Sequence, residues 1–133
     1  WTPIILINRN VDADMLAAVY RAADLCLVSS VQDGMNLVAK EFIACQTDER
    51  GVLVLSRFAG AAEEIQGAVL INPFHLDGFA PGVRHAIEMS EPERRERMRR
   101  MREQLGRWTI FDWLDQVLER VSSLIAERAA ATT

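Results

Sequence analysis

Short apolar runs alternate with segments of helical periodicity over the first half of the chain. The apolar runs predict buried strands over Pro3–Asn8, Leu25–Ser30, Val52–Ser56 and Ala68–Asn72. The segments between them place apolar residues on one helical face. They predict helices over Met15–Ala23, Asn36–Cys45 and Ala61–Ile65. Asp12 or Asp14 is suited to cap the first of these helices.

After Pro73 the pattern is helical only. Apolar residues recur at helical spacing in three successive segments, Phe79–Met89, Glu91–Leu105 and Ile110–Ala126. The chain then ends in a short stretch rich in alanine and threonine. We expect one folded unit over residues 1–126, followed by a disordered tail over residues 127–133.

The order of these elements indicates the fold class. Strands that are apolar throughout and separated by helices favour a parallel sheet with helices on both faces. The predicted fold is therefore α/β, a doubly wound parallel sheet of the Rossmann-like kind. In such sheets ligands bind where the strands end and the next helices begin.

Composition and charge exclude several classes of protein. The chain has 133 residues, of which 50% are hydrophobic and 26% charged, as in ordinary globular domains. A formal net charge of −4 gives no electrostatic reason to bind nucleic acid, and the apolar runs are too short to span a membrane. Cys26 and Cys45 lack the spacing of metal ligands or of a disulfide framework, so we expect a cytoplasmic protein.

One junction between strand and helix carries the strongest candidate chemistry. After the second predicted strand, the chain runs through Asp33-Gly34-Met35-Asn36 into a helix that begins near Leu37. This turn is expected to present free N–H groups of Met35, Asn36 and Leu37 at the N-terminus of a helix. Those amides and the helix dipole suit an anion such as a diphosphate.

Two neighbouring residues fit the same site. Gly34 lacks a side chain, so its backbone can approach a ligand closely. Glu41, about one turn into the helix, has two oxygens that can accept hydrogen bonds from vicinal hydroxyls. A second interpretation needs no ligand, because Asp-Gly is a common turn, Asn36 a favoured N-cap and Glu41 an ordinary solvated residue. The residues alone leave both interpretations open.

The same stretch resembles the donor-site signature of the trehalose-6-phosphate synthase family. The signature is the run from Asp33 to Phe42, Asp-Gly-Met-Asn-Leu-Val-Ala-Lys-Glu-Phe. The likeness continues in four further stretches, which are Tyr20–Asp24, Gly51–Ser56, Phe58–Glu64 and Asn72–Phe74. It therefore covers most of the span from Pro3 to about Met101.

The resemblance implies a fold and an activity. The family has the GT-B fold, two Rossmann-like domains with the active site between them. Residues 1–126 would then be an incomplete C-terminal, nucleotide-sugar-binding domain. Members transfer glucose from a nucleoside diphosphate glucose to a sugar phosphate, with retention of configuration at the anomeric carbon. We therefore expect an enzyme that forms trehalose 6-phosphate from UDP-glucose, with ADP-glucose or GDP-glucose as alternative donors.

The resemblance also implies roles for single residues. Asp33 would be the catalytic-site residue that contacts hydroxyls of the donor glucose. The donor-binding residues would be Gly34, Met35, Asn36, Leu37, Val38 and Glu41. The backbone at Gly34, Met35 and Asn36 would hold the phosphates and sugar of the donor. Leu37 and Val38 would line the nucleotide pocket, and Glu41 would hold the ribose hydroxyls. No metal ion or other cofactor is expected, because helix amides and basic residues neutralise the leaving diphosphate.

Departures from the family pattern leave the product open. Gln32 stands where many members have Arg, and Ser30 stands where many have Pro. Glucosylglycerol-phosphate synthase shares the Asp-Gly-Met-Asn signature, so glucosylglycerol phosphate is an alternative product. The alternative to an enzyme is a non-catalytic Rossmann-like module that binds a nucleotide or a partner chain.

The family's donor-phosphate Arg and Lys, and most of its acceptor site, lie on segments that these 133 residues do not contain. We therefore expect this chain by itself to be inactive. The resemblance also implies that two further strands lie in the sheet between the first and second predicted strands, and these residues do not contain them. Unpaired apolar edges of a sheet recruit other chains, so we expect a homo-oligomer.

Overall fold

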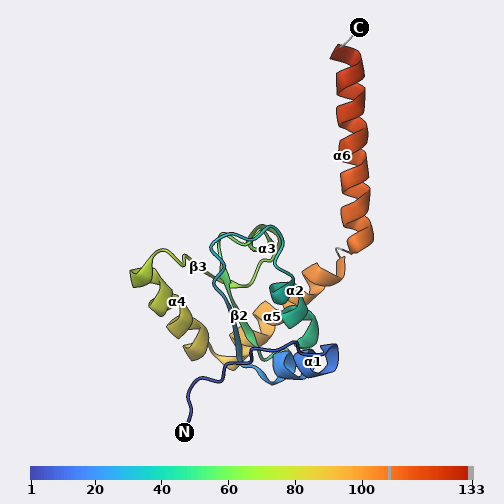
Figure 1. Ribbon diagram of the computed structural model, residues 1–133. Helices are drawn as coiled ribbons and strands as arrows, with labels where there is room; N and C mark the ends of the chain where they lie inside the picture. Colours follow the sequence, from blue (N-terminus) through green and yellow to red (C-terminus); the bar gives the residue numbers. More distant parts are fainter. Residues whose placement is uncertain (108, 132–133) are drawn as a thin grey trace.

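The computed structural model describes residues 1–107 and 109–131, and their centre is a small parallel sheet (Figure 1). Its strands are β1 (Leu25–Val28), β2 (Val52–Ser56) and β3 (Val69–Ile71), in the spatial order β1-β2-β3. Leu25 lies opposite Val52, and Val54 lies opposite Val69. Every residue of β2 is buried, because this strand has a neighbour on each side and helices above and below.

Among the described residues, six helices surround or extend this sheet. They are α1 (Ala13–Ala22), α2 (Leu37–Cys45), α3 (Ala61–Glu64), α4 (Leu76–Glu88), α5 (Glu91–Arg107) and α6 (Ile110–Ala131). Asp12 caps α1, since its Oδ1 accepts a hydrogen bond of 2.8 Å from the Met15 amide. None of the helices within the described residues is long and apolar enough to cross a membrane.

Each face of the sheet has its own core. On one face α2 and α5 cover the strands, with Phe42, Leu53 and Met98 fully buried. On the other face α4 packs over Val54 and Ile71. Full burial of a large apolar side chain stabilises the fold by about 1.5–3 kcal/mol. This two-sided arrangement confirms the predicted doubly wound α/β class.

The segment Pro3–Asn8 is not a strand, and the sequence-based prediction for it is wrong. Ile4, Ile5 and Leu6 are each at least 80% exposed, and the segment contains no assigned strand. A strand derives its stability from a hydrogen-bonded neighbour, and β1 is paired only with β2 in the described residues. The outer edge of β1 is consequently open, and Leu27 is 42% exposed.

The C-terminal helix α6 projects away from the body of the molecule (red in Figure 1). It extends to Ala131, so residues 127–131 are helical and the prediction of a disordered tail over them is wrong. The physical reason is that Glu, Arg and Ala are among the best helix formers. Residues 132 and 133 of the predicted tail lie outside the described residues.

Candidate functional site

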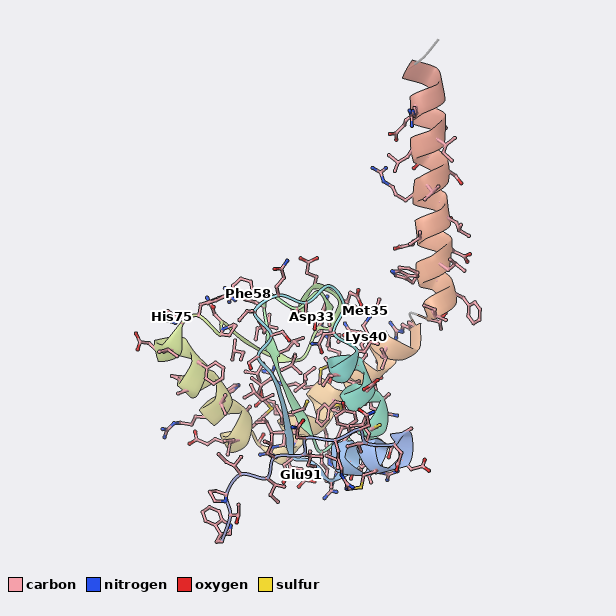
Figure 2. All side chains as sticks on the ribbon, in the orientation of Figure 1. Asp33, Met35, Lys40, Phe58, His75 and Glu91 are labelled. Carbon is pink, nitrogen blue, oxygen red and sulfur yellow. The ribbon has the colours of Figure 1, made fainter. Side chains whose placement is uncertain are left out.

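The loops that follow the three strands meet at one end of the sheet. Figure 2 shows Asp33, Met35, Phe58 and His75 at this end, with Glu91 at the opposite end. The arrangement follows from parallel strands, whose carboxyl ends share one edge. The turn predicted to bind a ligand therefore lies where the fold class places its ligands.

The loop after β2 supports this turn through its backbone. The Asp33 amide donates to the Phe58 carbonyl at 3.3 Å, and the Gly60 amide donates to the Asp33 carbonyl at 2.8 Å. A Cβ atom on Gly60 would lie only 2.2 Å from the Gly34 carbonyl oxygen. Gly60 thus allows the two loops to approach closely.

The carboxylate of Asp33 is held by its own turn. Its Oδ1 accepts hydrogen bonds from the amides of Met35 at 3.1 Å and Asn36 at 2.8 Å. Its Oδ2 accepts from Nδ2 of Asn36 at 2.8 Å. The Asn36 side chain and then the Met35 amide lower the pKa of Asp33 below its ordinary value, so this carboxylate is ionised at neutral pH.

This geometry corrects one expectation from the sequence. The amides of Met35 and Asn36 are not free, because Asp33 already accepts from both. An aspartate that bonds to the backbone two and three residues ahead forms a local turn of its own. The free amides are instead those of Leu37 and Val38, which precede the first hydrogen bond within α2. Neither amide has an acceptor among the described residues.

Asn36 fixes the start of α2. Its backbone is left-handed, with φ 64°, a conformation that Asn tolerates better than most residues. Its Oδ1 accepts from the Ala39 amide at 2.9 Å, which makes it the N-cap that the sequence predicted. Its Nδ2 lies 3.5 Å from the Ser30 hydroxyl as well as close to Asp33. Asn36, which is only 7% exposed, therefore links the segment after β1, the turn and the helix through one side chain.

The surroundings of the turn are open. A Cβ atom on Gly34 would meet nothing within 4 Å, so space for a ligand lies beside its backbone. The side chains of Leu37 and Val38 are 59% and 45% exposed on the first turn of α2. Apolar side chains and open amides thus lie side by side at this helix end.

Glu41 and Lys40 face different neighbours. Glu41 is exposed, and its Oε2 accepts a hydrogen bond of 3.3 Å from the Tyr20 hydroxyl. Nζ of Lys40 lies 2.7 Å from Oε2 of Glu64 on α3. Burial and the Glu41 carboxylate raise the pKa of Tyr20 to about 12, so the phenol stays protonated and can donate. Sequence reasoning missed both contacts because the partners are 21 and 24 residues apart.

The described residues contain no group of three or more His, Cys, Asp or Glu side chains placed to hold a metal ion. The groups that this edge offers a ligand are the α2 amides, the Asp33 and Glu41 carboxylates and the exposed apolar side chains. Such a set can bind an anion and several hydroxyl groups together.

Solved structures with the same fold define the class of protein. The chain is similar to a trehalose-phosphate synthase from Burkholderia xenovorans solved in complex with glucose-6-phosphate, with 43% identity and a TM-score of 0.84. The match covers 92% of this chain and 27% of the Burkholderia xenovorans chain. A second match is the E. coli structure described as bound with UDP-2-fluoro glucose, with 39% identity, a TM-score of 0.83 and coverage of 90% and 27%. The sheet is thus part of a GT-B glycosyltransferase fold.

The chain belongs to glycosyltransferase family 20, whose family model matches residues 1–123. A trehalose-6-phosphate synthase from Sinorhizobium fredii is 44% identical over 124 residues, which are 92% of this chain and 27% of that protein. A bifunctional trehalose-6-phosphate synthase/phosphatase from Thermoproteus tenax is 41% identical over 130 residues, 98% of this chain and 17% of that protein. The chain therefore spans about a quarter or less of the length of these relatives.

Proposed function

We propose that this chain is the donor-binding part of a retaining glycosyltransferase that transfers glucose from UDP-glucose to a sugar phosphate and forms trehalose 6-phosphate. One observation carries the proposal. The turn from Asp33 to Asn36 caps α2 at the carboxyl edge of the sheet and leaves the Leu37 and Val38 amides open. Membership of glycosyltransferase family 20 supports this use of the edge.

The open amides suit the diphosphate of the donor. They lie in the first turn of α2, where the helix dipole is positive. Hydrogen bonds to a charged acceptor are roughly twice as strong as bonds between neutral groups. As the glycosidic bond breaks, negative charge grows on the leaving diphosphate, and fixed amides stabilise that charge. The backbone of Gly34, Met35 and Asn36 borders the same space and would contact the phosphates and sugar.

Asp33 has capacity left for the donor glucose. A carboxylate offers about four acceptor positions. Three of them are used by Met35 and Asn36. The remaining position would accept a hydrogen bond from a glucose hydroxyl. The contacts within the turn hold the carboxylate in place before the sugar arrives, which lowers the cost of positioning it.

The nucleoside would lie along α2. Leu37 and Val38 would contact it with their exposed side chains, and Glu41 would accept hydrogen bonds from the ribose hydroxyls. None of these groups distinguishes one base from another. The choice of UDP rests on the E. coli relative bound with UDP-2-fluoro glucose, and ADP-glucose and GDP-glucose are the competing donors.

The acceptor would be glucose 6-phosphate. This choice rests on the Burkholderia xenovorans relative in complex with that compound. An acceptor that gives glucosylglycerol phosphate is the alternative. The chain alone should catalyse no transfer, because it spans only about a quarter of the length of its relatives.

A transfer assay on the full-length protein that carries this chain tests the proposal. UDP-glucose, ADP-glucose and GDP-glucose would each be supplied with glucose 6-phosphate, and NMR would identify the anomeric configuration of the product. We expect trehalose 6-phosphate from UDP-glucose with the α configuration retained. Nucleotide binding without transfer to any sugar phosphate would instead indicate a non-catalytic module.

Asp33→Asn provides the matched test of the site. Transfer should fall strongly while binding of free UDP is largely kept, because the proposed contact is to glucose. Glu88→Ala serves as the control, since Glu88 is an exposed carboxylate at the end of α4. If Asp33→Asn lowered UDP affinity as much as transfer, the loss of its hydrogen bonds within the turn would account for the whole effect, and the proposed glucose contact would be refuted.

A further inference from the structure

A hydrogen bond between Tyr20 and Glu41 joins helix α1 to helix α2, the helix that begins at the candidate site. Tyr20 lies in the last part of α1, and Glu41 lies in the middle of α2. The phenol donates to Oε2 of Glu41 at 3.3 Å. Nothing in the proposed function requires a residue of α1, so this contact needs its own explanation.

Tyr20 is itself firmly held. Its ring meets the ring of the buried Phe42 edge to face, with centroids 6.2 Å apart and an interplanar angle of 80°. Its carbonyl oxygen accepts a hydrogen bond from Nε2 of Gln46, a side chain that is 1% exposed. Oε1 of Gln46 in turn accepts from the Gly51 amide at 2.9 Å. Ring and backbone are thus both fixed against the core.

Glu41 has less support of its own. It is an exposed residue on the surface of α2, and a glutamate side chain in that setting samples several rotamers. A bond from a fixed phenol restricts that sampling. It occupies one carboxylate oxygen, and Oε1 stays available for a ligand.

We propose that Tyr20 is a positioning residue that holds the Glu41 carboxylate in the orientation that accepts the ribose hydroxyls of the donor. The inference rests on the proposed function, because it assumes that Glu41 binds ribose. Tyr20 acts through Glu41 and does not itself contact the donor. Preorganisation of this kind increases affinity by removing the cost of ordering the carboxylate when the nucleotide binds.

The phenol is suited to this task over the whole physiological pH range. Burial, together with the charge of Glu41 and its hydrogen bond, raises the pKa of Tyr20 to about 12. A protonated phenol can donate to a carboxylate, whereas a phenolate would repel it. The phenol therefore remains a hydrogen-bond donor at every pH well below 12.

Tyr20→Phe in the full-length protein is the matched variant. It removes the hydroxyl and keeps the ring against Phe42. Calorimetric titration would measure the dissociation constants of UDP and of 2′,3′-dideoxy-UDP, which lacks the ribose hydroxyls. We expect Tyr20→Phe to weaken UDP binding by about 3- to 10-fold, the scale of one hydrogen bond. Binding of the dideoxy compound should not change.

A double-mutant comparison separates positioning from a structural role. In the Glu41→Ala background Tyr20→Phe should have no further effect on UDP binding, because the group it positions is gone. Equal weakening of UDP and the dideoxy compound by Tyr20→Phe would show a general structural effect and overturn the proposal. So would equal losses from Tyr20→Phe with and without Glu41.

A different result is expected if Glu41 does not bind ribose at all. A wild-type protein that binds no nucleotide, or binds UDP and the dideoxy compound equally, would refute the ribose role of Glu41 and the positioning role with it. A wild-type protein that prefers UDP, with a Tyr20→Phe variant that keeps the full preference, would refute the positioning role alone.

Discussion

Replacement of Asn36 tests whether one side chain couples the acidic turn to the helix. Asn36→Ala removes the bond to the Ala39 amide, and loss of an N-cap costs about 1 kcal/mol. It also leaves alanine at φ 64°, where a Cβ without a polar side chain costs about 1–2 kcal/mol. We therefore expect Asn36→Ala to lower the free energy of unfolding by about 2–3 kcal/mol.

Asn36→Gly is the matched variant. Glycine adopts a positive φ without strain and costs only a few tenths of a kcal/mol as an N-cap. The glycine variant should therefore lose less than about 1 kcal/mol. Urea denaturation of both variants and the wild type, at one protein concentration, gives the two differences directly. Equal losses for Ala and Gly would show that Asn36 is not left-handed in solution, and the stated reasoning would fail.

The same substitution should alter the titration of Asp33. The Asn36 side chain is the largest cause of the lowered pKa of Asp33, so Asn36→Ala should raise that pKa toward its ordinary value. Since the pKa is depressed by folding, the stability due to Asp33 is present above the unfolded value and lost as pH falls. NMR titration of the Asp33 carboxyl carbon measures the change. An unchanged pKa would show that the bond between Nδ2 and Oδ2 is absent.

Further predictions concern Gly34 and Gly60, the stability of the fold at alkaline pH and the self-association of the chain. Gly34→Ala should change the unfolding free energy by less than about 1 kcal/mol, because its Cβ meets nothing within 4 Å, yet it should weaken donor binding by filling the ligand space. Gly60→Ala should cost about 1–3 kcal/mol by overpacking against the Gly34 carbonyl, and equal stabilities of the two variants would contradict this contrast. Because folding raises the pKa of Tyr20 to about 12, the stability that its hydroxyl contributes should be fully present below about pH 10 and be lost as pH rises toward 12. Unfolding measurements at alkaline pH should show no such decline for Tyr20→Phe. The isolated chain should associate at micromolar concentration through the open edge of β1 and the exposed segment Pro3–Asn8, and a compact monomer in light scattering would refute this.

The sequence predicted the elements that are defined locally. The predicted strand Val52–Ser56 coincides with β2, because its apolar run is buried on both faces. Asn36 is the cap of α2, as its residue type and position indicated. Both features depend on the residues themselves and their immediate neighbours.

Features that depend on residues far apart in the sequence could not be predicted from the local pattern of apolar and polar positions. Pro3–Asn8 has the composition of a strand, but within the described part of the chain it pairs with no strand, and the apolar side chains of Ile4, Ile5 and Leu6 are exposed. The contact between Tyr20 and Glu41 arises only once α1 packs against α2. Occupation of the Met35 amide by Asp33 depended on a side-chain rotamer, although an Asp two residues before a backbone donor is a known turn signal.

Calorimetric titration of the full-length protein with UDP-glucose and with UDP shows whether this edge of the sheet is the donor site. Glu41→Ala should weaken the binding of both ligands by about tenfold or more, the scale of hydrogen bonds to a charged group. Asp33→Asn should weaken the binding of UDP-glucose more than that of UDP, and Glu88→Ala should change neither affinity. Wild-type affinities in both the Glu41 and the Asp33 variants would contradict the assignment of this edge as the donor site.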